Sequence, residues 1–225
     1  MKDNRLGGLA LIIGAITGVI TMILHPVTGG SGHRITPAQF ETLAAMIVGV
    51  HVLAIAGIPL LFLGALALTR RLNSPNRIAI TALSIYSLSL VAVLIAPAIS
   101  GLVGTAILRK VAAGGAGSEQ WRLLMDYNHM INQAFSQIYV VASAVAIGLW
   151  SFVIVKTRAL SAAVGIYGLL FAIAALIAMA CGLALDVHHF GLIVFGEAIW
   201  LVTVGVLMMR ASSVPDAPEV SPPRT

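Results

Sequence analysis

Six long runs of apolar residues alternate with short polar segments along the chain. A membrane-spanning helix needs about 20 mostly apolar residues. Six stretches reach that length: residues 6–26, 43–68, 78–99, 136–155, 162–182 and 190–209. The first follows Lys2 and Arg5, as in a signal peptide, but its apolar run is too long and no small-residue cleavage site follows it, so we interpret it as a retained helix. The pattern predicts an all-α polytopic membrane protein, a six-transmembrane-helix bundle.

The connecting segments are short, and the chain shows no sign of a separate soluble domain. Residues 28–32 are rich in glycine and predict a turn, and residues 112–118 predict a flexible linker. The stretch 97–104 is expected to kink at its proline and then run along the outer membrane interface. Residues 212–225 carry four prolines and predict a disordered cytoplasmic tail. The predicted organisation is therefore one membrane domain over residues 1–211, followed by this tail.

The basic residues predict the orientation of the helices. Cytoplasmic loops of membrane proteins carry an excess of Lys and Arg. If both termini are cytoplasmic, nine basic residues lie inside: Lys2, Arg5, Arg70, Arg71, Arg77, Lys156, Arg158, Arg210 and Arg224. The other four of the 13 lie outside: Arg34, Arg109, Lys110 and Arg122. The ratio favours an N-in/C-in topology.

Composition narrows the class of protein further. Hydrophobic residues make up 59% of the chain and charged residues 9%, whereas a soluble domain has about 25% charged residues. This excludes a soluble enzyme, a nucleic-acid binder and a disordered protein. The lone Cys181 excludes an internal disulfide and a cysteine-built zinc site. Glycines such as Gly14 and Gly18 predict close helix packing in the lipid bilayer, either within the bundle or in a homo-oligomer.

All six histidines are predicted at the outer side of the membrane. At 1.5 Å per residue, His25 and His51 lie about 26–28 Å above the inner boundary, and His188 and His189 about 30–32 Å. His129 lies higher, at about 39 Å, on an extended helix, and His33 falls in the first outer loop.

Glu197 is predicted near the middle of the last helix, about 18 Å above the inner boundary. A carboxyl group there costs on the order of 3 kcal/mol, so it is expected to face the bundle interior. Its expected partners by height are His51, Gln137, Tyr139 or a bound cation. It is the candidate catalytic group, as a deep ligand or proton acceptor, and the alternative is a protonated packing acid.

Three classes of function remain open. Imidazoles and a carboxyl at similar depth are typical of a zinc, copper or iron site, with His25, His51, His188 and His189 as candidate ligands and a small or lipid-like substrate. The second class is a haem-binding electron-transfer subunit, in which two of His25, His51, His129 and His189 ligate haem b. The third is a non-enzymatic transporter, sensor or structural partner. Whether the protein is an enzyme is left open, although HExxH and GxSxG motifs are absent from the sequence.

Two short motifs resemble those of a known protein family. The chain opens its first helix with Arg5-Leu6-Gly7-Gly8, and its last helix contains Gly196-Glu197 followed by Trp200-Leu201. An Arg-x-x-Gly start and a Gly-Glu…Trp-Leu last helix are similar to a bacterial family of six-helix membrane proteins of unknown function. The resemblance implies a six-helix bundle in the bacterial inner membrane, and it implies no reaction.

Overall fold

The computed structural model describes residues 2–26, 37–72, 77–115 and 117–210, and its regular elements there are all helices. In chain order they are α1 (Lys2–Leu24), α2 (Pro37–Arg71), α3 (Arg77–Pro97), η1 (Ala98–Val103), α4 (Gly104–Ala113), α5 (Ser118–Thr157), α6 (Ala162–Ala180) and α7 (Val187–Arg210). Since α3, η1 and α4 form one continuous run, these residues contain six helices long and apolar enough to cross a membrane. The predicted all-α fold and its six long apolar segments are confirmed.

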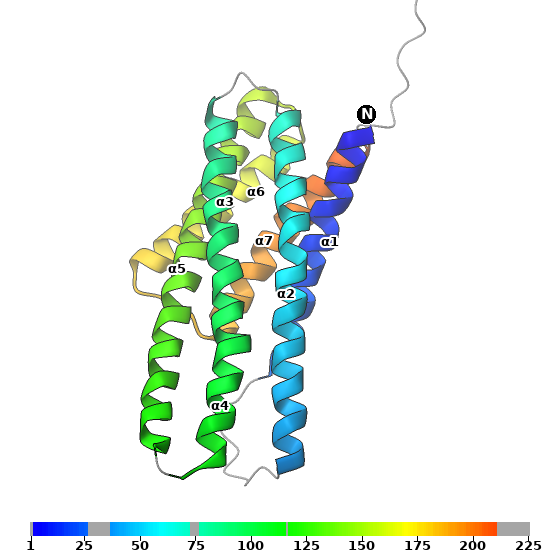
Figure 1. Cartoon of the computed structure of the whole chain (residues 1–225). Helices are drawn as coiled ribbons and strands as arrows, with labels where there is room; N and C mark the ends of the chain where they lie inside the picture. The colour runs from blue at the N-terminus through cyan, green and yellow to red at the C-terminus, as the bar shows by residue number, and fades with distance from the viewer. Residues whose placement is uncertain (1, 27–36, 73–76, 116, 211–225) are drawn as a thin grey trace, which may run out of the picture.

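The six helices differ in length more than the hydropathy pattern predicts. The runs α2, α3–α4 and α5 have 35, 37 and 40 residues, whereas α1, α6 and α7 have 23, 19 and 24. The long helices extend past the short ones at one end of the molecule (Figure 1). Hydropathy underestimates α5 most, because its first half contains charged residues that end an apolar run without ending a helix.

The segment after Pro97 differs from its prediction. It was expected to kink and lie along the membrane interface, but α4 instead prolongs the column of α3 and packs beside α5 (Figure 1). Between them η1 is a π-helix of six residues. A wider helical turn accommodates a proline, which lacks the N–H group needed for a regular α-helical bond.

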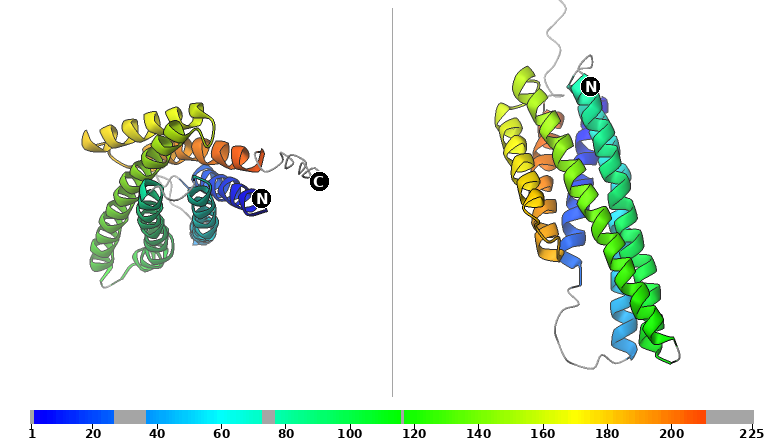
Figure 2. Two further views of the ribbon diagram at one scale, coloured as in Figure 1. Left: turned by 90° about the horizontal axis from the view of Figure 1, so that it is seen from above. Right: turned by 90° about the vertical axis from the view of Figure 1, so that its left-hand side faces the viewer.

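The helices form a closed ring of neighbours. Along this ring α1 packs against α2, α2 against α3, α3 against α5, α5 against α6, α6 against α7, and α7 against α1. Figure 2 shows this arrangement from above, with α6 and α7 side by side and α5, α3, α2 and α1 completing the circuit. Side chains inside the ring come from helices that are distant in sequence.

Large aromatic residues and close glycine contacts define the interior. Trp150 of α5 and Trp200 of α7 stack with ring centroids 6.2 Å apart, and both are fully buried. The predicted tight packing by glycines occurs within the bundle: Gly14 of α1 faces Leu61 of α2, and Gly64 of α2 faces Leu11 of α1. These glycines therefore bring α1 and α2 of one chain together.

Candidate functional site

Glu197 lies in the interior of the bundle. It projects from α7 between α3 and α5, and only 2% of its surface is exposed. The prediction that this carboxyl faces the bundle interior is confirmed. Burying a carboxyl group is costly unless other groups bind its oxygens.

Hydroxyl groups surround the Glu197 carboxyl. The hydroxyl of Tyr139 on α5 donates to Oε2 at 2.8 Å, and that of Tyr86 on α3 donates to Oε1 at 3.4 Å. The hydroxyl of Ser143, one turn along α5 from Tyr139, donates to the backbone carbonyl of Val140 at 3.4 Å. In the described part of the chain, no Lys, Arg or His forms an ion pair with Glu197. The site is therefore a carboxyl group held by hydroxyls from two neighbouring helices.

Tyr139 is confirmed as one of the partners predicted for Glu197. Of the other two predicted residues, His51 forms its hydrogen bond elsewhere and Gln137 lies apart from the carboxyl. The His51 ring donates from Nδ1 to the carbonyl of Ile47 at 2.6 Å. Gln137 is exposed and lines an apolar groove of about 440 Å³ together with residues such as Ile85 and Ile138. Tyr86 was missed as a partner, although it is a polar residue within an apolar segment that also contains Ser84, Ser87 and Ser89.

Aromatic rings cover the carboxyl–hydroxyl cluster on two sides. The Tyr139 ring packs against Phe190, with centroids 5.7 Å apart, and the Tyr86 ring packs edge-on against Trp150 at 5.2 Å. Trp150 in turn donates from Nε1 to the hydroxyl of Thr69 on α2 at 3.2 Å. Because apolar groups surround the cluster, changes in its charge are poorly screened by water. The chemistry that this cluster offers is hydrogen bonding and proton transfer between a carboxyl and the neighbouring hydroxyls.

A second polar feature joins the end of α1 to α2. The rings of His25 and His51 are in direct contact, with centroids 5.1 Å apart and ring planes inclined by 65°. His51 is buried, and Gly101 of η1 packs directly against its ring, where any larger residue would clash. The matched heights predicted for these two histidines therefore correspond to a real contact. A haem plane between them would need centroids about 6.3 Å apart, with each ligating nitrogen about 2.0 Å from the iron, so this pair does not accommodate haem.

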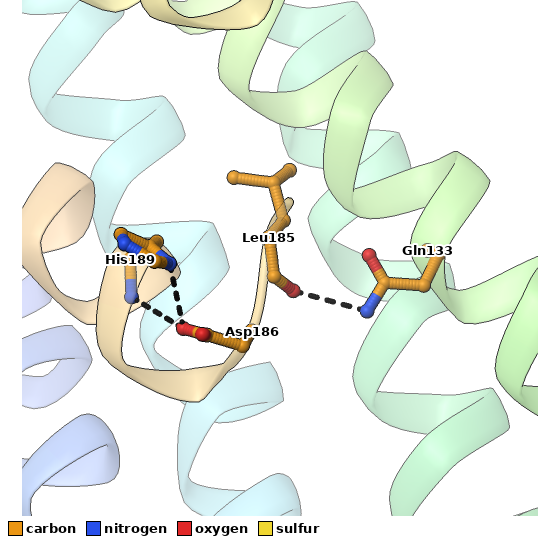
Figure 3. Close-up of polar contacts among 4 residues, drawn as sticks. All are labelled: Gln133, Leu185, Asp186 and His189. Atoms are coloured by element: carbon orange, nitrogen blue, oxygen red, sulfur yellow. Dashed lines mark hydrogen bonds and ion pairs between the residues drawn. The ribbon is translucent and has the colours of Figure 1, made fainter. Parts of the chain in front are cut away.

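His189 has a different role from the predicted metal ligand. Its backbone N–H donates to Oδ1 of Asp186 at 2.8 Å, and its ring Nδ1 lies 3.0 Å from the same oxygen (Figure 3). Asp186 thus caps the N-terminus of α7, and the His189 N–H lowers the pKa of this carboxyl. Nearby, Gln133 of α5 donates to the carbonyl of Leu185 at 3.0 Å and fixes the connection before α7 (Figure 3).

The structure does not support the predicted common metal site of His25, His51, His188 and His189. Across the described residues, no group of three or more His, Cys, Asp or Glu side chains is placed to hold a metal ion. His188 and His129 are exposed, and His33 lies outside the described residues. Among the described residues, the predicted histidine-rich side thus consists of one contacting pair, one histidine bonded to the capping residue Asp186, and two exposed histidines.

Other polar residues at the predicted outer side of the bundle join helices to one another. Glu41 of α2 and Arg109 of α4 form an exposed ion pair at 2.9 Å, and Asn128 of α5 is buried beside Gly104 of α4. Exposed ion pairs contribute little to stability, so this contact fixes geometry more than it adds energy.

Comparison with known proteins adds no relative from which a role could be transferred. The resemblance of the first and last helices to a bacterial family therefore stays a prediction. The chain matches no known family model, no curated protein and no solved structure.

Proposed function

We propose that this chain is a multi-pass protein of the bacterial inner membrane with both termini in the cytoplasm, and that Glu197 binds and releases a proton within the bundle. The observation that carries the proposal is a carboxyl group, 2% exposed, held by the hydroxyls of Tyr86 and Tyr139 from two other helices. The length and apolar character of the six helices support membrane insertion.

The hydroxyl cluster suits both protonation states of the carboxyl. A carboxylate accepts hydrogen bonds only, and two hydroxyl donors, those of Tyr86 and Tyr139, contact Glu197. A protonated carboxyl also donates one hydrogen bond, and a hydroxyl oxygen can accept it because hydroxyls act as donors and acceptors. The proton can therefore enter or leave while the heavy atoms keep their positions. A cationic partner would instead hold the group in its charged state.

Proton binding at this position would change the strength of the hydrogen bonds between α7 and its neighbours α3 and α5. Hydrogen bonds to a charged group contribute about 1.5–3 kcal/mol, compared with about 0.5–1.5 kcal/mol for neutral groups. Protonation therefore weakens the contacts that tie α7 to its two neighbours. We assign the protein to the proton-responsive membrane proteins, as a sensor or transporter component for a small or lipid-like ligand.

Infrared difference spectroscopy tests this proposal directly. The purified chain in lipid vesicles should show a protonated-carboxyl stretching band whose intensity changes with pH. Glu197→Gln should remove that band, while the control Glu41→Gln, at an exposed ion pair, should leave it unchanged. A pH-independent band, or one that persists in folded Glu197→Gln protein, would overturn the proposed role.

Reporter fusions test the proposed topology. A reporter fused after Arg210 should read cytoplasmic, and one inserted at Gly115, in the turn between α4 and α5, should read periplasmic. The distribution of basic residues supports this orientation. Equal readings at both positions would contradict it.

A further inference from the structure

We infer that His25 and His51 form a two-imidazole site for a tetrahedral divalent metal ion of the zinc type, with two coordination positions left to water or an external ligand. This site lies apart from Glu197 in its contacts and does not rest on the proton-binding role. It uses two protein ligands, so it differs from the larger histidine set that the sequence predicts.

The distance between the two rings carries the inference. A metal ion lies about 2.0 Å from an imidazole nitrogen and so about 3.2 Å from the ring centroid. Two imidazoles at neighbouring corners of a tetrahedron then have centroids about 5.2 Å apart, whereas at opposite positions they are about 6.3 Å apart. The observed 5.1 Å matches the tetrahedral arrangement. Zinc prefers this geometry with nitrogen ligands.

The hydrogen bonds of the two rings leave a ligating nitrogen on each. His51 donates from Nδ1 to the Ile47 carbonyl, which fixes the tautomer and leaves the Nε2 lone pair available. Metal-binding histidines commonly use such a carbonyl to orient the ring. His25 lies close to the Pro26 carbonyl, but its buried Nδ1 makes no well-formed hydrogen bond within the described part of the chain. Ring packing alone leaves that nitrogen unsatisfied, and a metal ion would satisfy it.

The surroundings of His51 also restrict the movement of its ring. Gly101 of η1 faces the Cβ, Cγ and Cδ2 atoms of His51, and a side chain at this position would displace the ring. A π-helix at this point is notable because such segments are frequent at functional sites. The ring is therefore held from α2 by the Ile47 carbonyl and from η1 by the glycine backbone.

Cobalt titration of the full chain in detergent tests the site. The protein is purified with an affinity tag that lacks histidine, and Co²⁺ is added while the visible absorption of tetrahedral Co²⁺ is recorded. We expect a signal that saturates at one equivalent and is displaced by Zn²⁺. His25→Gln and His51→Ala should each weaken binding at least about tenfold, since either removes one of the two ligands. The exposed His129→Gln is the matched control and should bind like the parent.

Thermal unfolding separates loss of the site from loss of the fold. Zn²⁺ should raise the melting temperature of the parent, because a ligand that binds only the folded state stabilises it. The same Zn²⁺ should leave the melting temperature of folded His25→Gln unchanged. Because His25 lies at the end of α1, we expect this substitution to disturb the fold less than His51→Ala. A parent without the tetrahedral signal, or a signal unchanged in folded His25→Gln, would overturn the inference. Loss of the signal in His129→Gln would show adventitious surface binding and would also overturn it.

Discussion

Replacing either tyrosine of the Glu197 site by phenylalanine provides a matched test of the hydrogen-bond geometry. Both rings are buried, and phenylalanine keeps the packing of Tyr139 against Phe190 and of Tyr86 against Trp150. Each variant therefore removes one hydroxyl and little else. The two hydroxyls differ in their distance from the carboxyl oxygens, 2.8 Å for Tyr139 and 3.4 Å for Tyr86.

These distances set the expected size of the two effects. Hydroxyl–oxygen hydrogen bonds are most favourable at about 2.7–2.8 Å and are weak beyond about 3.0 Å. Tyr139→Phe should therefore lower the free energy of unfolding by about 1.5–3 kcal/mol when Glu197 is charged and by about 0.5–1.5 kcal/mol when it is neutral. Tyr86→Phe should cost less than about 0.5 kcal/mol in either state, because its longer bond contributes little.

Equilibrium unfolding in mixed micelles at several pH values measures both effects. In the parent background the cost of Tyr139→Phe should vary with pH, and in a Glu197→Gln background it should stay in the neutral range at every pH. This comparison is a double-mutant cycle, which isolates the coupling between the two side chains. Equal costs for the two tyrosines, or a pH-dependent cost that survives Glu197→Gln, would refute the reasoning.

Two further predictions concern packing and helix capping. Gly168→Ala should destabilise the bundle, because the new methyl group would clash with Ser151 and the Trp200 indole. This overpacking costs about 1–3 kcal/mol, whereas the higher helix propensity of alanine contributes about 1 kcal/mol in the opposite direction. Gly49→Ala, where nothing lies within 4 Å, should be neutral or stabilising in the same unfolding assay, and equal behaviour of the two variants would contradict the packing described. Because the pKa of Asp186 is lowered in the fold, its capping of α7 is complete at neutral pH and is lost as the pH falls below the usual aspartate value of 3.8. The protection of the first-turn amides of α7 against hydrogen exchange, relative to their intrinsic exchange rates, should therefore fall in acid in the parent and not in Asp186→Asn. Identical acid responses would show that another group controls this end.

Hydropathy was sufficient to find the six long apolar helices and the level of individual residues along them. The position of Glu197 within the last apolar segment already placed it far from water, and burial follows from its cost in a membrane. Likewise, similar counts from the inner boundary placed His25 and His51 at one level. These inferences succeed because depth depends only on the regular rise of one helix.

The partners of these residues depend on helix rotation and neighbour order, which the sequence does not encode simply. Lipid-facing and interior positions are both apolar in such helices, so periodicity does not reveal which face turns inward. Tyr86 and Tyr139 meet Glu197 because α3 and α5 pack together beside α7, an order that differs from the order along the chain. The first turns of α5, before the extension predicted at His129, were missed for another reason, since their charged residues resemble a loop by hydropathy although they form helix.

Because the helices have unequal lengths, α3–α4 and α5 extend together beyond the shorter helices and form a paired tip. From the glycine turn at Gly114–Gly117, the chain runs through continuous helix for about 40 Å to Tyr86 on one side and about 31 Å to Tyr139 on the other. In the proposed membrane orientation, with a hydrocarbon core of about 30 Å, we expect the tip of this pair to stand clear of the lipid. Because continuous helix joins the tip to both tyrosines, we expect a force or a binding event at the tip to alter the hydrogen bonds of the Glu197 carboxyl.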